Sequence, residues 1–480
     1  MSEVDQCLLD TSRGGPLSPA AMHTLTLCGS AGWSDPSGVS SQSRRASDLL
    51  SAAHNSLASS LAPLTASTVL IRPGGGHALA DALTGLLAGV STPDATATLV
   101  VTAIDHSATL RVARWWRSQG HPTITIGVDA LGHIDAQALL EAALVTGPTV
   151  VCLQLANGEV GTLQDVAAIV EQLSAAGVPT MLDVTASAGR ISIPGGWSVL
   201  AADAVSWGGP RGTGVLVVAA GSPWRAPEPA IASEQPVSLI VAAASALEAA
   251  EAERAVESAR AWAQIARIRD DVQRHIPDVV IAGDPQRRLP HVLTLSALYV
   301  DGESLVRALD ERGISVGSGS ACASDSGEPS HVLAAMGVLT GGNVRLCLPL
   351  GCSDAAIDRF ISAFPAALAG LREAAPIPSV DGGVASPGPT VQNDAMDATA
   401  EPQAWYDERG SRCPAPVIAL ARAVFVRPPG TVVAVMASDP AAETDIPAWC
   451  RLRGAEYLGT RPPRDGGDGL AYLVRTPLQS

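Results

Sequence analysis

Two kinds of hydrophobic pattern alternate along the first half of the chain. Short apolar runs rich in β-branched residues are typical of buried strands, and they lie at 67–71, 98–102, 123–126, 149–155 and 181–183. Segments with apolar residues at helical spacing lie before and between them, at 44–61, 78–87, 110–119 and 136–144. Because strands that alternate with helices usually pair in parallel, this part is predicted to be an α/β domain with a parallel sheet.

The second half begins with a long amphipathic stretch from Leu239 to His275. It predicts a helix that connects the large domain to a smaller one, to which we assign a strand at 291–296 and a helix at 304–312. Residues 376–404 are rich in Pro and Gly and show little apolar periodicity, which is typical of a flexible linker.

The remaining residues predict a small separate module. Strands at 431–436 and 470–474 and two apolar helical segments fit a β-α-β-α-β order, in which the bounds of the first strand are not assigned, and hence an α+β fold. The predicted organisation of the chain is 1–375 as one α/β region with a large and a small domain, 376–404 as the linker, and 405–480 as the module.

Composition limits the kinds of function. The 480 residues are 47% hydrophobic, so large cores are expected, but no apolar run has membrane-spanning length. The first ten residues lack a basic segment before an apolar one, so we expect no export signal and a cytoplasmic protein. The net charge of −16 argues against a nucleic-acid surface, and the eight cysteines show no metal-site or disulfide spacing.

One compositional fact changes the picture further. Arginine accounts for all 31 basic residues other than histidine, so the chain contains no lysine. A uniform codon bias could replace surface lysines by arginine without functional meaning. At a position that must form a Schiff base, the replacement cannot be neutral, because that bond requires an amine nucleophile.

The first candidate for chemistry is Cys322. Small residues surround it from Gly317 to Ser324, which leaves a thiol accessible on a loop, and Ser330 is a plausible N-cap of the next helix. An isolated cysteine is more often a small buried hydrophobe. However, this stretch, through Met336–Gly337, closely resembles the persulfide loop of NifS/IscS-type cysteine desulfurases, members of the class V aminotransferase family.

That resemblance implies a fold-type I architecture, a homodimer, and pyridoxal phosphate chemistry that releases sulfur from L-cysteine onto the loop thiol. By position, His106 matches the residue that stacks on the cofactor ring, Asp183 the partner of its pyridine nitrogen, and Arg345 the ligand of the substrate carboxylate. Two of these have ordinary alternatives. A lone loop histidine is often structural, and an arginine at a strand start is often a solvated charge.

The chain departs from the family at the cofactor. The family reads Ser-x-His-Lys and then Gly-Pro-Lys-Gly; here Gly209–Gly212 keeps the second part, and the lysine-bearing part is interpreted as deleted. Gly76 replaces a phosphate-binding threonine, Gly158 an asparagine and Ala186 a glutamine. Arginine cannot form the Schiff base, so covalent cofactor binding is not possible, whereas noncovalent binding stays open.

The C-terminal module carries the second candidate thiol. Cys413-Pro-Ala-Pro resembles the Cys-Pro-x-Pro signature of TusA-like sulfur carriers, and a helix N-terminus there is expected to lower the thiol pKa. Cys450 is expected in the core. We therefore predict a sulfur relay that uses Cys322 and Cys413 and exchanges sulfur with donor and acceptor proteins. The alternatives are a desulfurase with an atypical cofactor mode and a non-catalytic dimeric scaffold.

Overall fold

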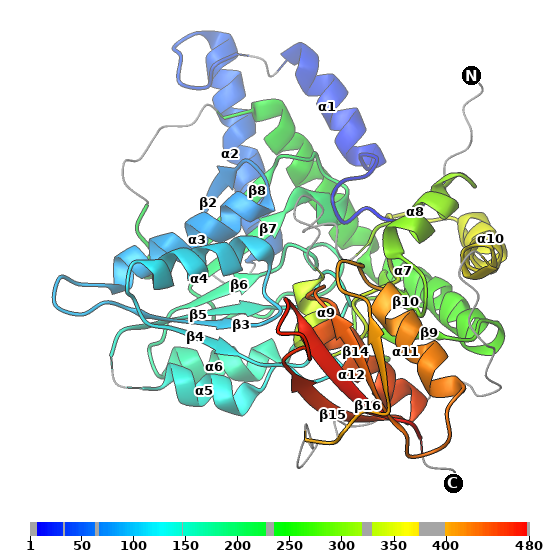
Figure 1. Cartoon of the computed structure of the whole chain (residues 1–480). Coiled ribbons are helices and arrows are strands. Elements are labelled where there is room, and N and C mark those ends of the chain that lie inside the picture. The colour runs from blue at the N-terminus through cyan, green and yellow to red at the C-terminus, as the bar shows by residue number, and fades with distance from the viewer. Residues whose placement is uncertain are drawn as a thin grey trace.

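The computed structural model describes residues 7–31, 34–62, 67–145, 147–226, 235–318, 329–373 and 399–477. In these residues the chain forms a large sheet domain, a smaller sheet domain and a C-terminal module (Figure 1). The predicted linker 376–404 lies mostly outside the described part. Its last residues already belong to the module, because the Gln403 amide donates to the Val432 carbonyl at 2.9 Å.

The large domain is built on a seven-stranded sheet of order β2-β8-β7-β6-β5-β3-β4. The strands are β2 (Ser67–Arg72), β3 (Thr98–Thr102), β4 (Thr123–Ile126), β5 (Thr149–Gln154), β6 (Thr180–Asp183), β7 (Val199–Asp203) and β8 (Gly214–Ala219). All neighbours are parallel except those of β8, which is antiparallel to both β2 and β7. The predicted parallel sheet is confirmed, although β7 and β8 were not assigned from the pattern.

Helices cover both faces of this sheet, which is why its central strands are apolar throughout. Figure 1 shows α3 (Gly75–Val90) and α4 (Ser107–Ser118) on one face and α5 (Ala136–Ala143) and α6 (Val166–Ala175) on the other. Alternate residues of β5 divide accordingly: Cys152 packs under α3 and α4, and Val151 under α5 and α6. The result is a rigid platform whose strand ends can carry a site.

The predicted connecting helix is confirmed as α7 (Val237–His275). Its first half packs in the core of the large domain through Leu247, and its second half in that of the small domain through Ile268. Helices α1 (Pro19–Ala31) and α2 (Ser41–Leu61) pack along the first half. Helix α1 was not predicted.

The small domain contains a three-stranded antiparallel sheet of order β12-β10-β9. Its elements are β9 (Val279–Ala282), β10 (Val292–Ala297), α8 (Gly302–Asp310), α9 (His331–Ala335), β12 (Asn343–Cys347) and α10 (Asp354–Glu373). A parallel bridge between β1 (Cys7–Leu8) and β11 (Ile314–Ser315) ties the N-terminus to this domain.

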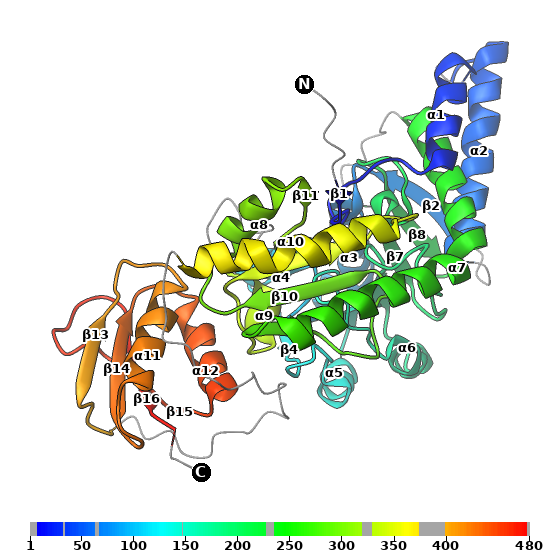
Figure 2. The same ribbon diagram turned by 90° about the vertical axis from the view of Figure 1, so that its right-hand side faces the viewer.

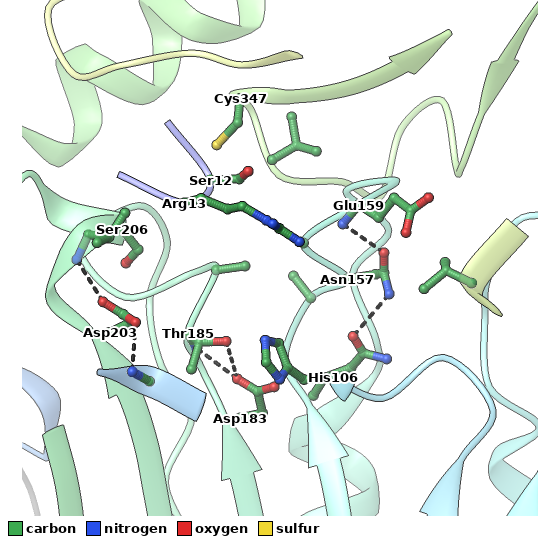
Figure 3. A pocket seen from close by; sticks show the side chains of 18 of the residues that line it. Ser12, Arg13, His106, Asn157, Glu159, Asp183, Thr185, Asp203, Ser206 and Cys347 are labelled. Atoms are coloured by element: carbon green, nitrogen blue, oxygen red, sulfur yellow. Dashed lines mark hydrogen bonds between the residues drawn. The ribbon is translucent and has the colours of Figure 1, made fainter. Parts of the chain in front are cut away.

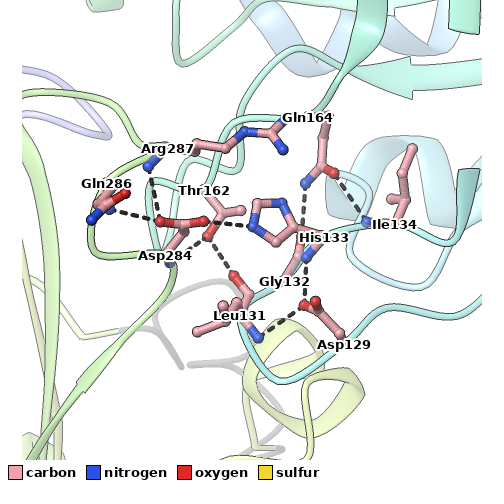
Figure 4. A network of polar contacts seen from close by, with 10 residues as sticks. All are labelled: Asp129, Leu131, Gly132, His133, Ile134, Thr162, Gln164, Asp284, Gln286 and Arg287. Atoms are coloured by element: carbon pink, nitrogen blue, oxygen red, sulfur yellow. Dashed lines mark hydrogen bonds and ion pairs between the residues drawn. The ribbon is translucent and has the colours of Figure 1, made fainter. Parts of the chain in front are cut away.

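A buried polar network joins the two domains (Figure 4). His133 Nε2 lies 2.7 Å from Asp284 Oδ2, and the Asp284 amide donates to Thr162 Oγ1 at 3.0 Å. Burial alone would raise the pKa of Asp284, but hydrogen bonds from the Gln286 and Arg287 amides and from His133 outweigh it and lower that pKa. The network fixes the small domain against the loops of the large one.

The C-terminal module has one strand more than predicted. Its elements are β13 (Ala404–Asp407), α11 (Ala415–Phe425), β14 (Val432–Ala437), α12 (Ala442–Arg453), β15 (Glu456–Arg461) and β16 (Leu470–Arg475), with sheet order β13-β14-β16-β15. Strand β15, which pairs with β16, is the addition. Figure 2 shows the module at one end of the molecule, next to the small domain.

Candidate functional site

A cavity opens at the carboxyl ends of the parallel strands, where ligands of open α/β sheets usually bind. Each strand supplies residues from its end: His106 follows β3, Asn157 follows β5, Asp183 ends β6 and Asp203 ends β7. Arg345 of β12 closes the cavity from the small domain. The three cavity residues predicted from the sequence are therefore brought together.

His106 and Asp183 face each other across the floor of this cavity (Figure 3). His106 caps α4 through Nδ1, which accepts from the Ala108 amide at 3.1 Å. Asp183 Oδ1 accepts from the Thr185 amide at 2.8 Å and from its hydroxyl at 2.7 Å. Enclosure by the protein lowers the pKa of His106 and raises that of Asp183, and the Coulomb attraction between the two groups partly offsets both effects.

Arg345 is 6% exposed, so the alternative of a solvated surface charge is wrong. Its Nη2 donates to Asp10 Oδ2 at 3.0 Å and also to the Ser12 hydroxyl. Burial opposes the charge, but Asp10 outweighs it and raises the pKa of Arg345. The guanidinium that the resemblance assigns to a substrate carboxylate already has a carboxylate partner within the chain.

Three further cavity residues escaped sequence reasoning. Arg13 extends across the cavity above His106 (Figure 3), and Asp203 and Ser206 follow β7. The signal for Arg13 was present, since the opening segment of the resembled family lines its active site. Asp203 gave no signal, because the segment around it was interpreted as shortened.

The cofactor end of the cavity does not match pyridoxal phosphate. The resemblance places the cofactor phosphate at the N-terminus of α3, but here the Gly75 amide donates to Asp203 Oδ2 at 2.7 Å. The deletion of the lysine-bearing part stays a prediction. The chain reaches the cavity after β7, and Val205 and Ser206 form part of its wall.

Cys322 lies in 319–328, outside the described residues, but both flanks of that segment meet the cavity wall. On one side, Gly317 and Arg345 exchange backbone hydrogen bonds of 3.0 and 2.8 Å. On the other, Ser330 caps α9, as predicted, by accepting from the Leu333 amide at 3.2 Å. The Ser330 hydroxyl also donates to Glu159 Oε1 at 2.6 Å. Gly317 and Ser330, the described residues on either side, therefore both contact residues of the cavity wall.

The second thiol, Cys413, lies just before α11 and is half-buried. Its amide donates to Asp439, and its thiol forms a hydrogen bond with Asp445. Burial and these two carboxylates raise the pKa of Cys413 far above its ordinary value. The prediction of a lowered thiol pKa is therefore wrong, because the charges around the helix N-terminus outweigh its dipole.

Asp445 also fastens the module to the small domain. Its Oδ1 accepts from the Thr340 amide at 2.6 Å and the Thr340 hydroxyl at 2.8 Å, and its Oδ2 accepts from the Gly341 amide at 3.2 Å. Nearby, Trp449 Nε1 donates to the Tyr299 hydroxyl at 2.9 Å. One buried carboxylate thus contacts both the Cys413 thiol and the segment that follows α9.

Apolar packing supports the same interface. Leu298, Tyr299 and Leu339 of the small domain belong to one continuous core with the module. Arg453 of α12 adds an ion pair with Asp278. Cys450 is buried in this core, as predicted.

Comparisons with known proteins agree with this division of the chain. The sequence matches the family of class-V aminotransferases over residues 30–231 and 232–360, and that of the sulfurtransferase TusA over 406–475. It is 29% identical to the cysteine desulfurase NifS of Azotobacter vinelandii, covering 64% of this chain and 79% of that protein. It is 31% identical to the cysteine desulfurase IscS of Salmonella arizonae, covering 58% and 72% respectively.

Solved structures show the same fold. A NifS-like protein superposes with a TM-score of 0.69 at 20% identity, covering 76% of this chain and all of that one. A NifS-like protein from Rickettsia africae gives 0.66 at 19% identity, covering 75% and 99%. At these identities the likeness concerns the fold alone. Of the helices within the described ranges, none has the length and apolar character needed to span a bilayer.

Proposed function

Since this chain belongs to the class V aminotransferase family and carries a TusA domain at its C-terminus, we propose that it is a sulfur-relay protein in which Cys322 receives sulfur as a persulfide and passes it to Cys413. The curated relatives are named cysteine desulfurases. This chain cannot release sulfur from L-cysteine through a covalently linked cofactor, because without a lysine no Schiff base can form.

The position of Asp445 carries the proposal. Asp445 is hydrogen-bonded to the Cys413 thiol and to Thr340 and Gly341. That segment follows α9, and α9 is the first described helix after Cys322 in the sequence. The acceptor thiol is therefore held at the interface with the element that carries the donor loop. A contact between the small domain and the C-terminal module far from Cys413 would not support a relay.

The transfer step balances without an external oxidant. The Cys413 sulfur attacks the outer sulfur of the Cys322 persulfide, so one S–S bond forms as another breaks and Cys322 leaves as a thiolate. Asp445 is placed to accept the Cys413 proton, since burial raises the pKa of Asp445 to about 6. The thiolate released at Cys322 takes up a proton in turn, and no net oxidation or reduction occurs.

The donor in this proposal is a persulfide-bearing protein or small persulfide, and a homodimer, typical of the family, completes it. L-cysteine is the donor in the second candidate function, a desulfurase that binds its cofactor noncovalently. What favours that candidate is the placement of His106 and Asp183 together on the cavity floor. A scaffold that merely presents the carrier is the third.

Mass spectrometry of the persulfidated protein tests the relay. With a persulfide donor, both Cys322 and Cys413 should gain one sulfur. Cys322→Ser should reduce the sulfur on Cys413 to background, whereas Cys413→Ser should leave Cys322 loaded. Cys28→Ser, which removes a buried thiol of α1 outside both sites, is the matched control and should change neither. Unchanged loading of Cys413 in Cys322→Ser would mean that Cys413 receives sulfur directly from the donor and that residues 1–375 act only as a scaffold.

A further inference from the structure

The segment that follows β7 lines the cavity and contains no lysine. Strand β7 ends at Asp203, a single 3-10 turn (Ala204–Trp207) follows, and Asp203, Val205 and Ser206 all line the cavity. The family's lysine-bearing Ser-x-His-Lys also comes ahead of Gly-Pro, which is Gly209–Pro210 here. Here the residues ahead of Gly-Pro that line the cavity, Asp203, Val205 and Ser206, include no lysine.

Asp203 is hydrogen-bonded to the N-terminus of α3, a feature of the cavity that would otherwise attract an anion. Its Oδ2 accepts from the Gly75 amide at 2.7 Å, and its Oδ1 accepts from the Val205 amide at 3.1 Å. Gly75 is in the first turn of α3, a helix of 16 residues whose N-cap is Gly74. Because free N–H groups and the dipole make a helix N-terminus favourable for negative charge, a carboxylate there satisfies the site internally.

The packing around Gly75 shows how closely the carboxylate approaches. A Cβ at Gly75 would lie 2.7 Å from Asp203 Oδ2 and 2.8 Å from Asp203 Cβ. The backbone at this position must lack a side chain for the contact to form. The glycine and the aspartate therefore belong to one arrangement.

The wall of the cavity at Ser206 is also closed by hydrogen bonds within the chain. The Ser206 hydroxyl donates to the Ala188 carbonyl at 2.6 Å, and Arg190 Nε donates to the Ser206 carbonyl at 2.6 Å. Next to it, a Cβ at Gly158 would lie only 3.1 Å from the Cβ of Ala186. Gly158 and Ala186 stand where the resembled family has an asparagine and a glutamine that contact the cofactor.

We infer that the Asp203 carboxylate occupies the position on α3 that a cofactor phosphate would need, so that this cavity excludes pyridoxal phosphate. A phosphate placed there would lose the Gly75 amide as a donor and would face a carboxylate of like charge. The inference concerns the cavity alone and does not depend on the sulfur relay.

The absence of lysine makes this testable with unusual clarity. In Ser206→Lys the new residue is the only lysine, so borohydride reduction and peptide mapping locate a bound pyridoxyl group without ambiguity. Two ligands separate the phosphate from the ring: pyridoxal phosphate and pyridoxal. With Asp203 present, Ser206→Lys should bind pyridoxal at least as well as pyridoxal phosphate. Adding Asp203→Ser should raise the affinity ratio in favour of the phosphate form by about tenfold or more.

Controls distinguish this from general reactivity or misfolding. The double variant Asp203→Ser, Ser174→Lys carries its one lysine on the exposed face of α6. That lysine should show no preference between pyridoxal phosphate and pyridoxal. Circular dichroism and thermal unfolding report on folding in each variant. If a variant with Ser206→Lys does not fold, dialysis of the wild-type protein and of Asp203→Ser against pyridoxal phosphate still tests the claim, with retention expected only in Asp203→Ser.

Retention of pyridoxal phosphate by the wild-type protein, or an affinity ratio that Asp203→Ser leaves unchanged, would overturn the inference. Both cysteines are intact in all of these variants, so sulfur loading of Cys322 and Cys413 can be measured in the same samples. A failure of the relay would therefore be seen separately from a failure of the phosphate argument.

Discussion

The N-termini of α3 and α11 are both met by aspartates from outside the helix, and the comparison between them separates a lost site from a kept one. At α3, Asp203 from a neighbouring strand accepts from the Gly75 amide. At α11, Asp439 accepts from the Cys413 amide, and Asp445 bonds the thiol. In the first case the carboxylate stands where an external anion would bind. In the second, two carboxylates lie beside a Cys-Pro-x-Pro motif whose cysteine and prolines are present.

The difference teaches that a helix N-terminus does not by itself decide the chemistry next to it. Its preference for negative charge can be satisfied by the chain, which removes the reason for a ligand or a thiolate to be there. At α3 this satisfaction is permanent, because Asp203 lies within the large domain. At α11 it depends partly on the docked position of the module, because Asp445 also bonds Thr340.

The largest effect is expected from Asp445→Asn at the kept site. Removing the charge beside Cys413 should lower its raised pKa and increase the thiolate fraction, by about tenfold for each pKa unit. Alkylation of Cys413 by iodoacetamide, followed by peptide mass spectrometry from pH 6 to 9, should be at least about tenfold faster than in the wild-type protein, whose rate should stay low through pH 9.

Glu443→Gln is the matched control, because it removes an exposed acid two residues away on the same helix. It should leave the alkylation rate and its pH profile near those of the wild-type protein. Equal rates in Asp445→Asn and Glu443→Gln would show that Asp445 does not hold the thiol in its protonated form.

A smaller effect is expected from Asp203→Ala at the lost site. If the carboxylate stabilises the start of α3, its removal should lower the free energy of unfolding by about 1 kcal/mol, the usual cost of losing a helix cap. Urea denaturation measures this, with Asp94→Ala, in an exposed turn, as the control. No loss of stability relative to that control would mean that Asp203 only lies near α3 without supporting it.

Much of the fold followed from periodicity. The alternation of strands and helices predicted the parallel sheet. The family resemblance assigned His106 and Asp183, which follow or end predicted strands, to one site, and both line one cavity. This works because the carboxyl ends of parallel strands meet at one edge, so local pattern fixes a global position. The N-cap at Ser330 is equally local and was also correct.

What sequence reasoning missed depends on contacts between distant segments. Asp445 meets Thr340, which lies 105 residues earlier, and Asp203 meets Gly75 across 128 residues. No local pattern announces either contact. The wrong sign for the Cys413 pKa has the same origin, since the motif supplies the helix dipole, whereas the carboxylates come from the ends of other elements.

The most direct test of the central claim is the order in which the two thiols acquire sulfur. Wild-type protein, freed of small molecules, would be mixed with a persulfide donor, quenched with an alkylating agent at successive times and analysed by peptide mass spectrometry. The account predicts that Cys322 loads first and that sulfur on Cys413 rises after a lag as Cys322 is discharged. Loading of Cys413 without a lag, or ahead of Cys322, would contradict it.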